Sequence, residues 1–413
     1  MAPTTVTAGQ DGMSWAELGY PMARSCPFDP PAELARLRAE NPVSRIRLWD
    51  GSSPWLVTRY EDVRRILSDP TVSADTDRPN YPFHSEGLRI QRANSRSFSF
   101  FDMDDPDHAR YRKMITSDFT VRSTEALRPL VEKLVNELLD AMERGPNPVD
   151  LVDAFALPLP SMVICHMLGV PYTDHDFFQE HSRALLDTTM DVESSMRAND
   201  ELRAYLSDLM AKKEAEPTDD ILGRLAQRYV LTGQLGRDEA VSMALLLLVA
   251  GHETTANMIG FGTLTLLQHP ERAAEVRDGD TTVVKSAVEE LLRLLTVAHG
   301  GLRRTALEDI EIDGVTIRAG EGIIAAVESA NRDETVFESP GELDIHRSTN
   351  HHVAFGFGVH QCLGQPLARL ELQIVYPALL RRLPNLHLAV PLDEIRYRDE
   401  TVIYGVQALP VSW

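Results

Sequence analysis

Ten residues near the C-terminal end, Phe355 to Gly364, constrain this chain more than any other stretch. Gly356 and Gly358 give the backbone the freedom for a tight loop, and apolar residues recur at helical spacing from Leu363 onward. Cys362 is therefore expected where a loop becomes a helix. The N–H groups and the positive dipole end of a helix favour the anionic, metal-binding form of a cysteine. Taken alone, the pattern also fits a buried structural cysteine behind a glycine-rich turn.

The spacing Phe-x-x-Gly-x-His-x-Cys-x-Gly resembles the haem-binding loop of the cytochrome P-450 family. In that family the cysteine thiolate is the axial ligand of the haem iron and pushes electron density onto it, so that bound dioxygen is cleaved. The resemblance implies that Cys362 is the iron ligand of haem b and that its neighbours in the loop contact the haem. The residues that match the loop are Phe355, Gly358, His360, Cys362, Gly364 and Ala368.

A stretch free of proline from Arg237 to Gln268 predicts the longest helix. Inside it, residues 250–255 read Ala-Gly-His-Glu-Thr-Thr, with a glycine, an acid and hydroxyls where a core helix favours leucine or alanine. A polar stripe facing water is one interpretation. The motif also resembles the family's oxygen-binding helix, in which the helix widens locally to admit dioxygen. This resemblance implies that Glu253 and Thr254 deliver protons to dioxygen and that Ala250 lies against the haem.

Other motifs concern the groups that hold the haem propionates. Residues 107–114 predict a basic helix in an otherwise acidic chain, and His108 and Arg112 share one of its faces. A solvated basic face is the plain interpretation. In the family, however, Asp-Pro-x-His-x-x-x-Arg marks a helix whose histidine and arginine bind a propionate, a group that suits an arginine fork. The other propionate ligands that the resemblance implies are Arg304, or Arg303 if the register slips by one, and His360.

Glu290 and Arg293 are three residues apart on a helix predicted at 281–295, so they share one face. Such pairs are common on surface helices. Together with Arg347, however, they resemble the family's Glu-x-x-Arg pair and its later arginine, which form a buried network that braces the thiolate loop. The three residues are therefore expected to have a structural role.

Shorter patterns predict a small β region beside a mainly helical body, as the cytochrome P-450 haem-thiolate fold requires. The predicted strands are residues 46–48, 55–58, 310–312, 315–317, 323–327 and 402–406. Residues 72–100 are expected to form a long loop with scattered aromatic side chains, of a kind that is usually functional or disordered. No linker composition interrupts the chain, so residues 1–413 are expected to form one domain.

Charge and cysteine content narrow the possible partners and compartment. The formal net charge of −21 argues against nucleic acid or an anionic membrane surface. The three cysteines, Cys26, Cys165 and Cys362, lack zinc-finger spacing and suit a reducing cytoplasm. The start of the chain has no basic segment followed by an apolar core, and the apolar run 243–250 is far shorter than the roughly 20 residues of a membrane span. No signal peptide or membrane anchor is expected.

The resemblance implies a cytoplasmic monooxygenase that inserts one atom of O2 into a hydrophobic small molecule. A small ferredoxin and its NAD(P)H-dependent reductase are expected to supply electrons, steered by a basic patch at Arg110, Lys113 and Arg369. One alternative is a nitric oxide reductase of the same fold that uses NAD(P)H directly, which the segments at 41–44 and 55–58 resemble. Another is a non-catalytic haem protein acting as a gas sensor or carrier.

The substrate pocket is expected to be mostly apolar and to include part of residues 81–101. Such a pocket favours a macrolide, terpenoid, steroid or aromatic polyketide without choosing among them, and it does not separate hydroxylation from epoxidation. The other residues expected in the pocket walls are Leu246, Val249, Ala250, Val297, Ala298, His299 and Ile403.

Overall fold

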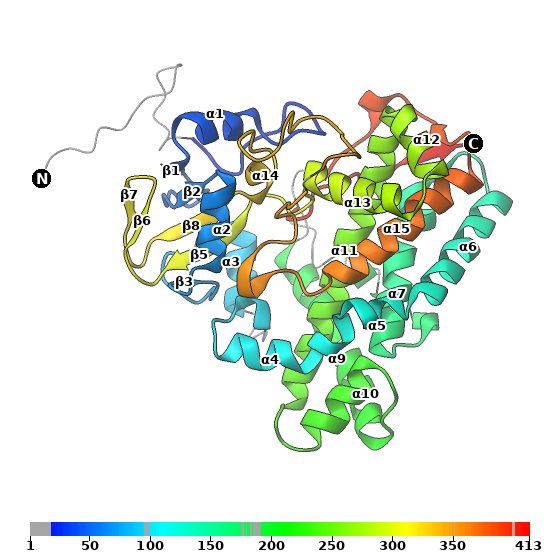
Figure 1. Cartoon of the computed structure of the whole chain (residues 1–413). Coiled ribbons are helices and arrows are strands. Elements are labelled where there is room, and N and C mark those ends of the chain that lie inside the picture. The colour runs from blue at the N-terminus through cyan, green and yellow to red at the C-terminus, as the bar shows by residue number, and fades with distance from the viewer. Residues whose placement is uncertain are drawn as a thin grey trace, which may run out of the picture.

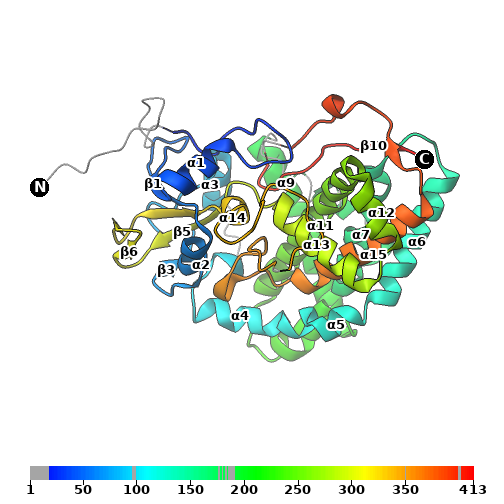
Figure 2. The ribbon, with the colours of Figure 1, turned by 45° about the horizontal axis from the view of Figure 1, so that its top comes forward.

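The molecule divides into a large helical part and a smaller β-rich part (Figure 1). This structure, a computed structural model, describes residues 18–94, 99–174, 177–178, 180–181, 184, 191–348, 350–398 and 401–413. Most strands gather at one end of the molecule, and the long helices pack beside them; a rotated view shows the same division (Figure 2). The mainly helical fold with a small β region that the sequence predicts is confirmed.

The helices account for most of the described chain, and the two long ones predicted at 237–268 and 281–295 have the expected bounds. Two short π-helical segments, Val152–Ala156 and Ala226–Val230, adjoin α7 and α10. The helices are α1 Ala32–Glu40, α2 Tyr60–Ser68, α3 Glu86–Asn94, α4 Asp107–Ile115, α5 Val121–Glu125, α6 Arg128–Arg144, α7 Pro158–Leu168, α9 Val192–Ala215, α10 Ile221–Leu225, α11 Arg237–Gln268, α12 Pro270–Asp278, α13 Thr281–Leu295, α14 Val327–Ala330 and α15 Gln365–Arg382.

Helix α11 crosses the middle of the helical part and packs against α7, α9 and α15 (Figure 1). Its contact with α15 is close because Gly262 has no side chain: a Cβ there would lie 2.0 Å from the hydroxyl oxygen of Tyr376. That hydroxyl donates a hydrogen bond of 2.6 Å to the carbonyl of Met258. A glycine in mid-helix costs about 1 kcal/mol relative to alanine, and here it lets the two helices meet.

Helix α11 is long and apolar enough to cross a membrane. The sequence did not predict this, because only the shorter apolar run 243–250 stood out. Within the molecule, however, 72% of its apolar window is buried against other elements. Its apolar side chains therefore contribute to the core of the helical part.

The largest sheet has five strands in the order β1-β2-β8-β5-β3. Strand β2 pairs in parallel with β8, and the other neighbours pair antiparallel. A second sheet has the order β4-β10-β9, and β6 and β7 form a separate hairpin. The strands are β1 Val43–Arg45, β2 Trp55–Val57, β3 Val72–Ser73, β4 Val149–Asp150, β5 Leu302–Ala306, β6 Ile310–Ile312, β7 Val315–Ile317, β8 Gly322–Ala325, β9 His387–Leu388 and β10 Pro410–Ser412.

Three predicted elements differ from the structure. The strand expected at 46–48 lies earlier, at Val43–Arg45, although Ile46 and Leu48 are buried as their pattern suggests. The expected strand 402–406 is wrong, because its residues form only isolated bridges with two different segments, and the C-terminal strand is β10. The loop expected at 72–100 contains helix α3, and residues 95–98 lie outside the described residues.

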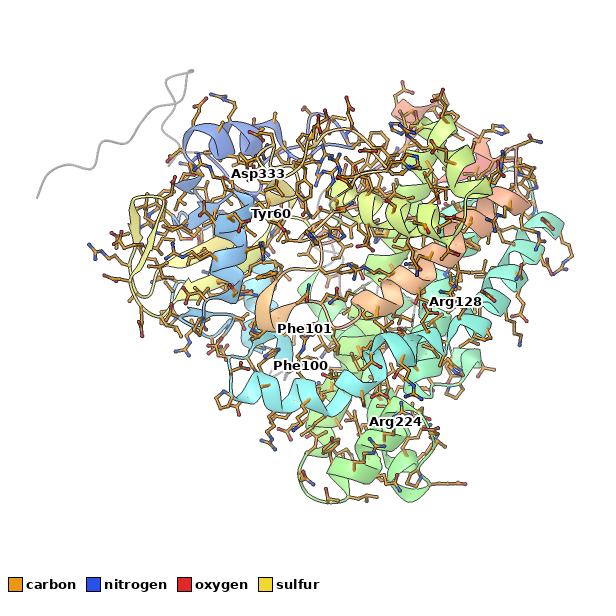
Figure 3. The ribbon with its side chains drawn as sticks, viewed as in Figure 1. Tyr60, Phe100, Phe101, Arg128, Arg224 and Asp333 are labelled. Carbon is orange, nitrogen blue, oxygen red and sulfur yellow. The ribbon has the colours of Figure 1, made fainter. Side chains whose placement is uncertain are left out.

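Helix α2 is tied to the segment that follows α14 by a hydrogen bond at its first residue. The backbone N–H of Tyr60 donates to a carboxylate oxygen of Asp333 over 2.8 Å, and both residues are labelled in Figure 3. An acidic side chain at a helix N-terminus satisfies a free N–H and favours the helix dipole. This contact fixes α2, against which the cysteine loop closes.

Candidate active site

The loop that carries Cys362 folds as its glycines predict. Gly356 and Gly358 have left-handed φ angles of 69° and 76°, and the N–H of Cys362 donates to the carbonyl of Phe355 over 2.8 Å. A Cβ on Gly358 would lie 2.3 Å from the carbonyl oxygen of Leu67 in α2. Only glycine therefore allows both this backbone conformation and this close approach.

The sulfur of Cys362 faces a cavity, just before the start of α15. Burial raises the pKa of this thiol, while the backbone N–H groups of Gly364 and Gln365 and the guanidinium of Arg112 act in the opposite direction. The N–H groups at the helix N-terminus therefore act in the direction that the sequence predicts, and burial opposes them. A metal cation bound to the sulfur would supply the missing stabilisation, since coordination deprotonates a thiol outright.

The cavity has a volume of about 440 Å³ and lies between α11 and the cysteine loop. One face of α11 lines it, because Leu247, Ala250, Gly251 and Thr254 recur at spacings of three and four residues. The remaining walls include aromatic and aliphatic side chains such as Phe101, which is labelled in Figure 3.

The structure places some of the residues predicted for the pocket in the wall of this cavity and others away from it. Ala250, Val297 and Ala298 line this cavity, together with Tyr81 and Phe101 from the 81–101 segment. On α11 the prediction chose a wrong helical phase, because one residue corresponds to a rotation of about 100° and Leu247 faces the cavity. The expected residues that do not line this cavity, within the described chain, are Leu246, Val249, His299 and Ile403.

Four cationic or imidazole groups gather at one end of the cavity. The rings of His108 and His360 have centroids 4.1 Å apart, and Arg304 is buried beside them. Arg112 donates from Nη2 to the carbonyl of Gln361 over 2.6 Å, which joins α4 to the cysteine loop. The structure thus brings together His108, Arg112, Arg304 and His360, whereas Arg303 contacts His84.

The electrostatics of this cluster indicate an anionic ligand. Burial, with the nearby Arg304 and His108, lowers the pKa of His360 to about 3. Burial also lowers the pKa of His108, whose Nε2 atom is buried and has no hydrogen-bond partner among the described residues. Buried cationic groups are normally paired, so two carboxylates bound here would complete the set.

Thr254 lines the cavity, and its hydroxyl donates to the carbonyl of Ala250 over 2.9 Å. This is the backward bond that a threonine makes within a helix, and it keeps the hydroxyl at the helix surface next to the cavity. The local widening implied by the resemblance is not seen, because α11 is α-helical from Arg237 to Gln268 without a break.

Glu253 does not line the cavity. Its side chain is 1% exposed and accepts a hydrogen bond of 3.1 Å from Arg398 Nη1, while His252 Nε2 lies 3.6 Å from its other carboxylate oxygen. The water-facing interpretation of this stretch is therefore wrong. The partner Arg398 was missed from the sequence, because it follows 145 residues later in an irregular segment that carries no motif.

Glu290 lies at the centre of a largely buried network. Arg293 donates to its carboxylate from Nε over 2.8 Å and from Nη2 over 2.7 Å, and Arg347 Nε donates over 3.2 Å. Arg293 also donates to the carbonyls of Asn331 and Pro340 over 2.8 and 2.9 Å. Burial works to raise the pKa of Glu290, but the two arginines hold it below its usual value.

The neighbouring Glu289 forms a second network that the sequence did not suggest. It accepts hydrogen bonds of 2.7 and 2.9 Å from Arg369 and lies 3.1 Å from His352 Nε2. Burial works to raise the pKa of Glu289, but the hydrogen bonds from His352 and Arg369 hold it at about 2. Arg369 is thus engaged in an ion pair that joins α13 to α15.

Comparison with known proteins places the chain in a family. A family model described as Cytochrome P450 matches residues 33–402. The chain belongs to the cytochrome P450 family.

Curated P450 relatives match almost the whole chain. The cytochrome P450-SU2 of Streptomyces griseolus is 52% identical, over 95% of this chain and 95% of its own. The mycinamicin VIII C21 methyl hydroxylase of Micromonospora griseorubida is 43% identical, over 95% of this chain and 99% of its own. The crystal structure of GfsF aligns with a TM-score of 0.91 and 50% identity, covering 96% of this chain and 100% of that one. This P450 is accordingly a monooxygenase that binds haem b and uses O2 as co-substrate.

The residues of this cavity fit a haem. Cys362 lines the same cavity as α11, and its thiolate would hold the iron of a haem bound there. The cluster of His108, Arg112, Arg304 and His360 has the donors that two propionates require, including the unpartnered Nε2 atom of His108. The apolar walls suit the porphyrin.

A buried acid in α15 gives this P450 a predictable pH dependence of stability. Glu371 is 1% exposed, and one of its carboxyl oxygens has no hydrogen-bond partner in the described parts of the chain. Burial raises its pKa from 4.5 to about 8. Between these two pH values the native protein keeps a proton that the unfolded chain releases, so the free energy of unfolding falls as pH rises.

The substitution Glu371→Gln removes this titration. The wild type loses stability between about pH 5 and about pH 8, and the variant does not. The Tm of the variant minus the Tm of wild type is therefore expected to increase by several degrees over this range. Calorimetry at a series of pH values measures this difference in Tm. The control is Glu394→Gln at an exposed site, for which the difference in Tm from wild type should stay constant with pH. A Glu371→Gln difference that is equally constant would contradict the assignment of a neutral buried acid.

Proposed function

We propose that this P450 inserts one atom of O2 into a hydrophobic secondary metabolite and receives electrons from a ferredoxin. The observation that carries the proposal is that Cys362 and Thr254 line one largely apolar cavity. A relative whose solved structure is titled as bound to mycinamicin VIII supports a natural-product substrate. We also propose that residues 1–413 act as a single domain in the cytoplasm.

Each polar group of the site is proposed to have a distinct role. Haem iron held by Cys362 would activate dioxygen for transfer of one oxygen atom. Phe355, Gly358, Gly364 and Ala250 would contact the haem, and the cluster at His108, Arg112, Arg304 and His360 would bind its propionates. Glu290, Arg293 and Arg347 would hold the segment before the cysteine loop in place.

Proton delivery is proposed to start from the hydroxyl of Thr254, which reaches the cavity. Glu253 would resupply protons, although it is paired with Arg398 and lies behind the cavity wall. A proton must therefore pass between Glu253 and the hydroxyl through a change of side-chain position or through water. Because the carboxylate is paired with Arg398, it would first take up a proton from solvent and then pass it toward the hydroxyl.

The electron donor is proposed to be a small ferredoxin with its NAD(P)H-dependent reductase. The sequence predicted a basic patch of three side chains for this partner. In the structure Arg369 pairs with Glu289, which balances its charge within the chain. Arg110 and Lys113 are exposed on α4, next to the residues proposed for the propionates, and they remain available to steer an acidic protein.

The substitution Thr254→Ala tests this function. With reductase, ferredoxin and a compound that binds the haem-loaded enzyme, NAD(P)H consumption should persist while product per NAD(P)H falls roughly 10²-fold and hydrogen peroxide appears. Thr254→Ser should restore coupling.

Thr265→Ala is the matched control, because Thr265 makes the same backward bond in α11, to Phe261 over 2.9 Å. Unchanged coupling in Thr254→Ala would overturn the assigned role. Direct oxidation of NAD(P)H without ferredoxin, driven by nitric oxide, would identify the nitric oxide reductase alternative, and no coupled consumption at all would identify a carrier.

A further inference from the structure

Strand β5 presents two consecutive arginines to different surroundings. Successive side chains of a strand point to opposite faces, so Arg303 and Arg304 diverge. Arg304 joins His108 and His360 at the proposed propionate site. Arg303 also lines the cavity, but its guanidinium contacts His84. The proposed haem site therefore leaves Arg303 without a role.

Arg303 belongs to a second polar cluster at the cavity edge. Its Nη2 atom donates to His84 Nδ1 and, over 3.0 Å, to the carbonyl of Gly300. The rings of His84 and His299 have centroids 6.2 Å apart. The Nε atom of Arg303 and the Nδ1 atom of His299 are buried, and neither has a hydrogen-bond partner among the described residues. Buried polar atoms without partners are rare in folded proteins.

The charge balance of this cluster favours an anion. Burial, with the nearby Arg303, lowers the pKa of His84 to about 3, and burial, with Arg24 and Arg303, lowers the pKa of His299 to about 4. Both imidazoles are therefore neutral. Burial raises the pKa of Glu328, the acid near Arg303. The guanidinium of Arg303 contacts His84 and the carbonyl of Gly300, and no carboxylate of the described residues forms an ion pair with it.

We propose that Arg303 in the cavity wall, supported from behind by His84 and His299, forms a carboxylate-binding subsite, so that the substrate of this P450 is a hydrophobic compound carrying a carboxylate. The inference rests on the monooxygenase function proposed above and narrows its substrate class. The Nε–H of Arg303 has no acceptor among the described residues, whereas its Nη2–H groups already donate to His84 and Gly300, so a carboxylate would accept a charge-assisted hydrogen bond from Nε. Val297, Ala298 and Leu302 line the same cavity and would contact the hydrocarbon part.

A purely structural role for Arg303 predicts a different result. Its Nη atoms bond to the carbonyls of Gly300 and Gly301, over 3.0 and 3.4 Å, and so support the turn before β5. That role needs neither the unpartnered Nε nor a place in the cavity wall. If Arg303 were only structural, its replacement would change the affinities for an acid and for its ester equally. If Arg303 binds the carboxylate, its replacement changes the affinity for the acid alone.

The test compares acids with their methyl esters on the haem-loaded enzyme. Dodecanoic acid and dehydroabietic acid, each with its ester, are titrated by calorimetry and by the optical spin-state change. Wild type should bind at least one acid about tenfold or more tightly than its ester, as one charge-assisted hydrogen bond predicts. Arg303→Gln should abolish this preference and leave the affinity for the ester unchanged.

The control is Arg318→Gln, which removes an exposed arginine that pairs with Asp309 outside the cavity and should keep the preference. If Arg303→Gln does not fold, His84→Gln should weaken the preference without altering β5. Equal affinity for acid and ester in every wild-type pair, or equal loss of both in Arg303→Gln, would overturn the subsite. Ester binding with an intact haem-thiolate spectrum would still support the monooxygenase function.

Discussion

Replacing Cys362 by alanine is expected to remove the long-wavelength Soret band of the reduced carbon monoxide complex and to reduce oxygenation to background. Cys362 is the cysteine that lines the cavity within the described chain, so its loss would leave the iron of a haem bound there without a thiolate ligand. The cluster around Arg304 and His360 is untouched, and haem should still be retained through its propionates. Haem content and the carbon monoxide difference spectrum measure the two effects separately.

The control is Cys26→Ala, because Cys26 is partly exposed and does not line the cavity. It should keep the spectrum and the activity of wild type. A Cys362→Ala protein that retains the long-wavelength band would refute the proposed iron ligand, and a band of the histidine-ligated kind in wild type would refute it as well.

The parts of the site that could be predicted from the sequence are those whose functional residues lie close together in one short segment. The cysteine loop, the pair Glu253-Thr254 and the motif of His108 and Arg112 each occupy a single short segment, and the structure brings them around one cavity or directly behind its wall. Local spacing sets these positions, because a helix or a tight loop fixes which neighbours share a face.

The parts that were missed depend on contacts between distant segments. The pairing of Arg398 with Glu253 and of Arg369 with Glu289 is invisible in a single sequence, since any arginine on the surface has the same local pattern. The helical phase of α11 was also mistaken. That helix is buried on most of its surface, so hydrophobic periodicity does not distinguish Leu246 from Leu247.

Two predicted strands, at 46–48 and 402–406, differ from the structure for a similar reason. Strand β1 pairs with β2 only through residues 43–45. Ile46 and Leu48 are buried beyond the end of that pairing, so their alternating pattern suggested a strand there. At residues 402–406 the β-branched sequence is typical of a strand, but its residues meet two different partners at single positions. Strand propensity reflects burial on a pleated surface, and pairing is decided by tertiary contacts.

The substitution Arg293→Ala is expected to lower the free energy of unfolding by about 3–5 kcal/mol, the usual cost of removing one partner of a buried ion pair. Glu290 and Arg293 are both fully buried, with 0% exposure of either side chain. The variant leaves Glu290 charged in the interior with Arg347 as its remaining arginine, and it removes the donor to the carbonyls of Asn331 and Pro340. Urea unfolding followed by circular dichroism measures the change.

The matched control is Arg128→Ala, at the same spacing of three residues from Glu125 but on the surface (Figure 3). That pair is also bidentate, with distances of 2.9 and 3.0 Å, yet its side chains are 34% and 47% exposed. Exposed pairs contribute about 0–1 kcal/mol, so the control should unfold almost as wild type does. Similar losses in both variants would show that hydrogen-bond geometry, and not burial, determines the contribution of the Glu290 network. In that case its proposed role in supporting the cysteine loop would have to be abandoned.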